Sequence, residues 1–484
     1  MSFWTKYSSK LPKERGKKLF HHMTTIMFMV GAVVGAFVYI FPEFIIHIYA
    51  PGLWILAEGQ IIRELAIQQL KIMTPCIVLA GPVGLGFGYM SAEGNNILPS
   101  ISPAFSSSLL IVSCLVYTFT RRLNASFSGG TLVSVGVSLG LLIQWIIQVI
   151  VHGRSWSDII PDSLINILTS GDVFEFFSLL LPATVSSGLA QIASLTDLCF
   201  ASPIPGAAAG LSYAYLMVMA PLGALSTIII LPLVPTFSKL VKTSSWESLV
   251  DNLICAVLLC MVIILPIFST IRILAKPIIH VLLERFAFDS SAGALVSTLF
   301  LAYSYGAPFF IVRDLLVTVF YALGDGKGPF LVSAAAIALN AVLDWLSVSR
   351  FNLGAQGLAL STSFTAAISV VLLFHLLQRK LPGLPNYGAM IYPTILLLSC
   401  CITSNLSTSA GYILMGKLGS FPFLSRNCLM KELLSVSLAS AIGVIGFFAP
   451  VFLLHLFGVE LVRDLFRILI KQQSLRPVVK FFDP

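Results

Sequence analysis

Two neighbouring ionisable residues, Arg313 and Asp314, interrupt an otherwise apolar stretch of the chain. A charged side chain inside a bilayer costs at least about 2.5–3.5 kcal/mol on insertion scales, so it normally faces a cavity or a partner. Adjacent residues on a helix point about 100° apart, so these two side chains do not simply pair side by side. Two interpretations stay open: Arg313 contacts an anionic headgroup in a cavity, or it extends as an interfacial arginine toward the cytoplasmic headgroups.

A second set of polar residues recurs at spacings of three and four: Thr184, Ser187, Gln191, Ser194 and Asp197. On a helix this spacing places all of them along one face. A polar face suits the wall of a water-filled cavity, but Ser and Thr hydrogen bonds between packed helices give the same pattern. The carboxylate of Asp197 favours the cavity, because it gains little from packing alone.

Asn340 and Asp344 lie one helical turn apart in a third apolar segment. They could line the cavity or pair with Arg313 from a neighbouring helix, but a hydrogen bond between the two is the interpretation we favour. The candidate substrate-binding residues are therefore Arg313, Asp314, Asp197, Gln191, Ser187, Ser194, Asn340 and Asp344.

The sequence contains no recognisable catalytic set. The seven histidines are dispersed, no Gly-x-Ser-x-Gly is present, and the eight cysteines include no Cys-x-x-Cys pair. The segment Gly324–Pro329 lacks the spacing of a phosphate-binding loop and is typical of a tight turn between helices. We therefore expect no enzymatic activity, no metal site and no cofactor.

The elements that must position these residues are membrane-spanning helices. The chain is 57% hydrophobic and only 10% charged, whereas soluble domains contain about 25% charged residues. Apolar stretches long enough to cross about 30 Å of hydrocarbon follow one another along the chain. We predict an all-α, polytopic integral membrane protein of about twelve transmembrane helices, at 23–41, 66–92, 100–120, 128–151, 173–201, 206–236, 248–271, 291–322, 328–349, 355–378, 386–409 and 433–457.

Two polar breaks, 152–172 and 380–387, divide these helices into groups of four, six and two. Repeat-built transporters commonly contain two blocks of equal size, so the first block looks as though it lacks a helix pair. The predicted parts are a basic cytoplasmic N-terminus (1–22), a four-helix remainder of an N-terminal lobe (23–152), an inter-lobe loop (153–172), a six-helix C-terminal lobe (173–380), an additional helix pair (381–460) and a basic cytoplasmic tail (461–484).

The net charge of +8 is spread over many loops, which argues against a nucleic-acid partner. More Lys and Arg residues fall on the side of the N-terminus than on the other side, so both termini are predicted to be cytoplasmic.

Several longer motifs are specific enough to compare with a known family. They are Leu181-Pro182, Leu231–Lys239, Leu282–Asp289, Phe320–Pro329 and Gly354–Leu360. Together they closely resemble the lipid II flippase (MurJ/MviN) family, which belongs to a superfamily (MOP) with the MATE and polysaccharide-lipid exporters. The resemblance is strong over about 173–380, fair over 20–152 and weak over the terminal pair.

This resemblance implies two six-helix lobes around a central cavity, with two added helices. It also implies alternating-access transport of an undecaprenyl-pyrophosphate-linked precursor of peptidoglycan, used in cell wall biogenesis. The implied partners are membrane lipids and the lipid-linked substrate, and the coupling ion stays open. A pyrophosphate needs cationic side chains in a dry cavity, and Arg313 stands where the family often has a lysine.

The sequence departs from the family pattern at two places. The family's first two helices, which carry several essential arginines, have no counterpart before Met1, and its acidic-plus-arginine pair falls on Tyr215 and Leu216. Two hypotheses follow. The protein is a transporter resembling lipid II flippases, which moves a lipid-linked or other anionic amphipathic substrate, or it is a degenerate, non-transporting relative that acts as a membrane scaffold or partner protein.

Overall fold

The computed structural model describes residues 13–56, 59–92, 97–122, 128–151, 173, 188, 191–285, 288–381, 383–385, 391–418 and 428–456. All regular elements in these residues are helices. The chain divides into two compact units, unit 1 (Met1–Gln191) and unit 2 (Ile192–Pro484). Each unit is described by itself.

Unit 1 is a bundle of long helices. Its described elements are α2 (Lys13–Ile40), α3 (Pro42–Tyr49), the short 3₁₀ helix η1 (Pro51–Trp54), α4 (Gly59–Ala92), α5 (Ile97–Arg122) and α6 (Gly129–Val151).

The helices of unit 1 pack closely through small and polar residues. A Cβ atom placed on Gly31 of α2 would lie 2.8 Å from the Val78 carbonyl oxygen of α4, so only glycine allows this approach. Gln148 of α6 donates a hydrogen bond to the Val83 carbonyl of α4 at 3.1 Å. Such contacts are typical of helix association in lipid, where apolar burial alone provides little driving force.

Unit 2 contains the other described helices. They are a helix over 191–201, which belongs to this unit from Ile192 onward, α9 (Ala207–Leu225), the π-helical turn η3 (Ser226–Ile230), α10 (Leu231–Lys242), α11 (Trp246–Leu282), α12 (Ser290–Ser304), α13 (Ala307–Ala322), α14 (Lys327–Ser349), α15 (Gly354–Gln378), α16 (Ile391–Leu418) and α17 (Cys428–Leu456).

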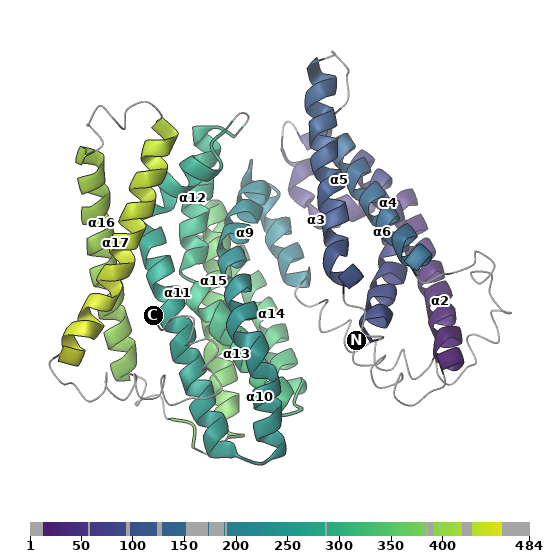
Figure 1. The fold of residues 1–484 in the computed structure, drawn as a ribbon. Helices are drawn as coiled ribbons and strands as arrows, with labels where there is room; N and C mark the ends of the chain where they lie inside the picture. The colour runs from purple at the N-terminus through teal and green to yellow at the C-terminus, as the bar shows by residue number, and fades with distance from the viewer. Residues whose placement is uncertain are drawn as a thin grey trace. The chain divides into compact units, whose positions relative to one another are not determined.

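Helix α11 is central to unit 2. It is 37 residues long with a mean hydropathy of 2.8 in its most apolar window, and Cys260, Ile264 and Leu274 are completely buried. Helices α12 and α13 contact it, and the pair α16–α17 packs against it as well (Figure 1). The core of unit 2 therefore forms around this helix.

Helices α12 and α13 form one bent span. They are inclined by 45° at the break after Ser304, where Pro308 cannot donate a backbone hydrogen bond. The Ser363 hydroxyl of α15 donates to the Ala302 carbonyl at 2.9 Å, which satisfies an acceptor near the break, as a bilayer requires. A Cβ on Gly306 would lie 2.7 Å from the Ser363 Oγ atom, so α15 packs directly against this bend. The helix predicted to be continuous over 291–322 is thus broken at its centre, next to Pro308.

Most of the predicted spans coincide with described helices. Eight described helices are long and apolar enough to cross a membrane, and the bent pair raises this number to nine. The predicted span 100–120 falls within α5, whose apolar part Ala104–Thr120 is shorter, and the span predicted at 386–409 overlaps α16. The predicted helix 173–201 lies largely outside the described residues.

Several helices extend beyond the predicted spans. Helix α2 begins at Lys13 and α11 continues to Leu282, because hydropathy marks the hydrocarbon layer whereas a helix can continue into the headgroup region. The short elements α3 and η1 were not predicted. Each begins with a proline, Pro42 and Pro51, at the first helical position.

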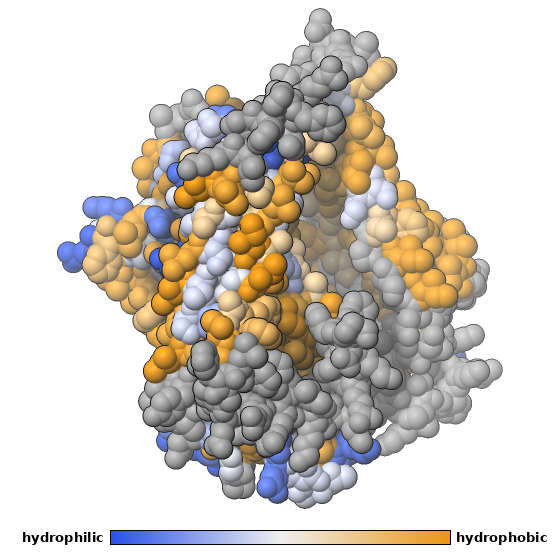
Figure 2. All heavy atoms as spheres, turned by 60° about the vertical axis from the view of Figure 1, so that its left-hand side comes forward, coloured by the Kyte–Doolittle hydropathy of each residue, from blue (hydrophilic) through white to orange (hydrophobic). Residues whose placement is uncertain are grey.

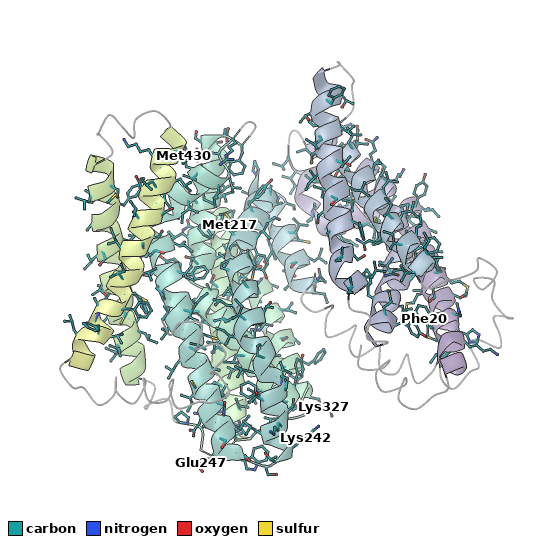
Figure 3. All side chains as sticks on the ribbon, viewed as in Figure 1. Phe20, Met217, Lys242, Glu247, Lys327 and Met430 are labelled. Atoms are coloured by element: carbon teal, nitrogen blue, oxygen red, sulfur yellow. The ribbon has the colours of Figure 1, made fainter. Side chains whose placement is uncertain are left out.

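The surface agrees with a lipid environment. Apolar side chains cover large parts of the described surface (Figure 2), and Leu331, Leu398 and Ile445 are more than half exposed. In unit 2, Lys242, Glu247 and Lys327 lie at one end, whereas Met430 lies at the opposite end (Figure 3). Apolar patches of this extent on a soluble protein would cause aggregation.

Candidate functional site

The most concentrated polar group in unit 2 lies among the 191–201 helix, α14 and α15. The Asn340 side-chain amide of α14 donates to the Asp197 Oδ1 atom at 2.7 Å and to the Asp344 Oδ2 atom at 2.9 Å. One amide group therefore joins two carboxyl groups that are far apart in sequence. We call Asp197, Asn340 and Asp344, with Thr362 and Thr365, the carboxyl cluster.

The threonines of α15 complete this cluster. The Thr362 hydroxyl donates to the Asp197 Oδ2 atom at 3.4 Å, and the Thr365 hydroxyl donates to the Asn340 Oδ1 atom at 3.4 Å. The hydroxyl of Tyr303, from α12, shares a hydrogen bond with Thr362. Four helices of unit 2 thus contribute to one polar group.

The local fold explains why these side chains meet. Asn340, Asp344 and Ser347 follow one another at helical spacings of four and three, so they form a polar stripe on α14. Helix α15 lies against this stripe, with the Ser347 and Ser361 hydroxyls 3.2 Å apart. A Cβ on Gly357 would lie 2.6 Å from the Ser347 Cβ atom, so glycine permits the close approach of the two helices.

Asp344 is fully buried, with 0% of its surface exposed. No hydrogen bond from the described residues reaches the Oδ1 atom of Asp344. The carboxyl groups of Asp344 and Asp197 nevertheless lie within hydrogen-bonding reach of each other. A hydrogen bond between two carboxyl groups requires a proton on one of them.

The cluster presents carboxyl, amide and hydroxyl groups to one another. Carboxylate, amide and hydroxyl oxygens are the ligands preferred by hard metal ions, and a pair of close carboxyl groups can share one proton. No group of three or more His, Cys, Asp or Glu residues with metal-binding geometry is present in the described part of the chain. The cluster therefore differs from a structural transition-metal site.

Arg313 and Asp314 form a second polar position, on α13. The Arg313 guanidinium donates to the Ser333 hydroxyl of α14 at 3.4 Å, and Asp314 is exposed. The Tyr215 hydroxyl of α9 lies within electrostatic reach of both residues and of Asp197. Tyr215 is 44% exposed, and its ring contacts the Tyr303 ring edge-to-face with centroids 5.5 Å apart. These tyrosines connect the carboxyl cluster with Arg313 and Asp314.

The structure thus brings together some predicted residues and separates others. The predicted hydrogen bond between Asn340 and Asp344 is confirmed, but both residues pair with Asp197, and neither pairs with Arg313. Gln191 and Ser194 are exposed on the 191–201 helix, and Ser187 lies outside the described residues. Whether any of them binds substrate stays a prediction.

Two cluster residues, Thr362 and Thr365, and the adjoining Tyr303 were not predicted. Thr362 and Thr365 are separated by three positions on α15, and Ser361 and Ser369 add to the same helix. This Ser and Thr pattern was available in the sequence. Tyr303 lies just before the helix break, and no local spacing indicates its contact with α15.

An ion pair closes the turn between α13 and α14. The Lys380 ammonium contacts the Asp325 carboxylate, whose Oδ1 atom also accepts from the backbone N–H groups of Lys327 and Gly328 at 3.0 and 3.1 Å. The hydrogen bond from Lys380 is the main cause that lowers the pKa of Asp325 below its usual value of 3.8, and the backbone donors add to it. Residues 324–326 of this segment therefore form a turn between helices, as predicted, and Lys327 already begins α14. Asp325 stabilises the turn and joins it to Lys380, after the end of α15.

Sequence comparison gives a consistent set of relatives. The family model for the lipid II flippase MurJ matches residues 1–426. A probable lipid II flippase MurJ of Synechocystis sp. is 32% identical over 461 residues, which cover 94% of this chain and 84% of that protein. A probable lipid II flippase MurJ of Rickettsia prowazekii is 25% identical over 386 residues, covering 78% and 72% of the two chains.

Comparison with solved structures supports the same fold. A lipid II flippase MurJ in an inward-closed conformation aligns with a TM-score of 0.70 at 19% identity, covering 95% of this chain and 87% of that one. An inward-facing MATE-family multidrug transporter of the MOP superfamily aligns with a TM-score of 0.62 at 14% identity, covering 77% and 83%. These matches confirm the predicted resemblance and the all-α, polytopic architecture.

Proposed function

Because the chain belongs to the lipid II flippase MurJ family, we propose that it moves an anionic, lipid-linked substrate of the polyprenyl-pyrophosphate type across the bilayer by alternating access. The chain is a multi-pass integral membrane protein, a transporter and not an enzyme. We place it in the cytoplasmic membrane of a bacterium or, in a eukaryote, in a plastid membrane.

The observation that carries the substrate class is the position of Arg313. Its guanidinium is half-buried within a membrane span and is held by a single long hydrogen bond of 3.4 Å to Ser333. Its neighbour Asp314 makes no side-chain hydrogen bond or ion pair with the described residues. A guanidinium without a carboxylate partner in a dry environment can bind a phosphate oxygen by charge-assisted hydrogen bonds.

We further propose that the carboxyl cluster binds the coupling ion, a proton or a hard cation. Two carboxyl groups that lie side by side, one of them fully buried, need positive charge between them, because like charges in a low-dielectric region repel strongly. Tyr303 and Tyr215 connect this cluster to Arg313 and Asp314. Ion exchange at the cluster can therefore act on the helix that carries the candidate substrate contact.

The test is a flipping assay in proteoliposomes with a fluorescent lipid-linked pyrophosphate substrate. We expect Arg313→Ala to reduce the initial rate at least tenfold, and Arg313→Lys to retain most of it because the cation remains. Arg350→Ala removes an exposed cation at the end of α14 and serves as the control, with an unchanged rate expected. Thermal unfolding of each variant separates a loss of transport from a loss of folding.

Two outcomes would contradict the proposal. Equal rates for the wild type and Arg313→Ala would exclude Arg313 from transport. A folded wild-type protein that flips no lipid-linked substrate would favour the alternative, a scaffold or partner protein, to which the Tyr215–Leu216 departure points. For the ion, wild-type transport that is independent of both proton and sodium gradients would contradict coupling at the cluster.

A further inference from the structure

A pocket of about 600 Å³ lies in unit 2 away from Arg313 and the carboxyl cluster. It is enclosed by the C-terminal part of α11, the N-terminal part of α12 and the pair α16–α17, which contribute Tyr412 and Glu432. Met430, only two residues before Glu432, marks this end of the unit in Figure 3, opposite Lys242 and Lys327. The pocket therefore lies where the terminal helix pair meets the six-helix part.

One wall of the pocket is a row of basic residues. Arg272, Lys276 and His280 follow one another at spacings of four on α11 and line the same pocket, since such residues share a helix face. Arg272 and Lys276 are exposed. Neither side chain makes a hydrogen bond or ion pair with any residue that the structure describes.

The acidic residues of the pocket lie against His280 and form no ion pair with these two cations. The His280 Nδ1 atom lies 2.6 Å from the Glu432 Oε2 atom, and its Nε2 atom lies 3.8 Å from the Glu284 Oε2 atom. Glu284 lies against α12, where a Cβ on Gly293 would be 2.0 Å from its Oε1 atom. Both carboxylates thus gather around His280 and leave Arg272 and Lys276 as the free positive end of the pocket.

The position of the row along α11 indicates which anion is nearby. The predicted apolar span of α11 ends at Ile271, and Arg272 follows directly. About 20 residues of helix cross the hydrocarbon layer, and the next turns pass through the layer of lipid headgroups. Apolar residues, including Ile273 and Leu301, line the pocket beside the cations. A headgroup phosphate and the start of an acyl chain would both find suitable contacts.

We propose that this pocket is a binding site for a phosphate group, which Arg272 and Lys276 hold, with the Tyr412 hydroxyl as a further donor. Guanidinium and ammonium groups bind phosphate by charge-assisted hydrogen bonds. The phosphate can belong to a membrane lipid or be free in solution, because both present the same oxygens. A lipid bound here would contact α11, α12, α16 and α17 together, and so would stabilise the docking of the terminal pair.

The experiment uses the full-length chain, purified in a neutral detergent and stripped of lipid. Three probes are titrated: dioleoyl phosphatidate, dioleoylglycerol with the same acyl chains but no phosphate, and inorganic phosphate. Binding is followed by the shift of the unfolding temperature and by lipid adducts in native mass spectrometry. The test variant is Arg272→Ala/Lys276→Ala, and Arg272→Gln/Lys276→Gln preserves more of the side-chain volume.

The matched control is Lys242→Ala/Lys327→Ala, which removes two exposed cations at the opposite end of unit 2. We expect the wild type and this control to bind phosphatidate at least ten times more tightly than either test variant. Dioleoylglycerol should show no dependence on the variant. If inorganic phosphate also binds more weakly to the test variants and displaces phosphatidate, the site accepts free phosphate. If only phosphatidate binding depends on the two cations, the ligand is a lipid.

Two results would overturn the proposal. The first is that the wild type and a folded test variant reach half-saturation at the same phosphatidate concentration. The second is a dependence of dioleoylglycerol binding on Arg272 and Lys276 as large as that of phosphatidate. The first would mean that the two cations only extend into the headgroup layer, and the second that the pocket recognises acyl chains.

Discussion

Replacing Asn340 by leucine removes the group on which the carboxyl cluster depends. The Asn340 amide nitrogen has two hydrogens, and each has one acceptor, Asp197 Oδ1 at 2.7 Å and Asp344 Oδ2 at 2.9 Å. Leucine has a similar size and no polar atoms. Asn340→Leu would therefore leave two carboxyl groups without their shared donor in a position where Asn340 is 4% exposed.

The size of the effect depends on the charge of the cluster. Hydrogen bonds between helices in membranes contribute about 0.6 kcal/mol on average, whereas hydrogen bonds to charged groups contribute about 1.5–3 kcal/mol. If the two carboxyl groups share one proton, one bond is neutral and the other ends on a charge. Asn340→Leu should then lower the free energy of unfolding by about 2–4 kcal/mol, the sum for the two bonds. If both carboxyl groups are neutral, the loss should be only about 1 kcal/mol.

The assay is equilibrium unfolding in mixed micelles by a denaturing detergent, followed by tryptophan fluorescence and circular dichroism. Asn405→Leu is the matched control, because the Asn405 Oδ1 atom of α16 is buried without a partner in the described part of the chain. Removing an unsatisfied polar group should be neutral or slightly stabilising. An Asn340→Leu variant as stable as Asn405→Leu, at neutral pH and in the absence of added ions, would refute a charged cluster.

Two further predictions concern positions outside the cluster. Because Lys380 lowers the pKa of Asp325 in the folded protein, the stabilisation from this carboxylate is present above the usual value of 3.8 and is lost as the pH falls through the lower folded value. The unfolding temperatures of the wild type and Asp325→Asn, which differ at pH 7, should therefore converge as the pH falls below 3.8, and Lys380→Ala should reduce the difference at pH 7. Gly306→Ala places a Cβ 2.7 Å from the Ser363 Oγ atom and 2.9 Å from the Ser363 Cα atom, and it should lower the free energy of unfolding by about 1–3 kcal/mol. The control is Gly223→Ala in helix α9, where no atom lies within 4 Å of the new Cβ, so this change should be neutral or stabilise by up to about 1 kcal/mol. Equal unfolding midpoints for the two variants would contradict close packing at the bend.

Hydropathy predicted where the chain crosses the membrane but not where its helices begin and end. The span 248–271 marks the lipid-facing part of α11, yet the helix continues to Leu282 through Arg272 and Lys276. Backbone hydrogen bonds in the headgroup layer form as readily as in the hydrocarbon layer, so the charge of a side chain does not end the helix. The elements α3 and η1 are short and contribute no long apolar window, which is why they were missed.

The candidate site shows a similar division between local and distant information. The bond between Asn340 and Asp344 spans one helical turn, and a spacing of four residues was sufficient to predict it. The bond from Asn340 to Asp197 joins residues 143 positions apart. No periodicity relates them, because their contact depends on how α14, α15 and the 191–201 helix pack.

The alternative partner of Asn340 and Asp344, Arg313, was considered on a physical assumption that does not hold at this site. Opposite charges attract, so Arg313 was considered as the partner from a neighbouring helix. In the structure the Asn340 amide joins two acidic residues, Asp197 and Asp344. The Arg313 guanidinium instead donates to the Ser333 hydroxyl and has its neighbour Asp314 within electrostatic reach. A protein optimised for stability alone would pair the arginine with a carboxylate, since a buried unpaired charge is costly. Under the function proposed above, keeping the two signs apart would leave the carboxyl cluster available to a mobile cation and Arg313 available to a phosphate, as transport of an anionic lipid coupled to a cation requires.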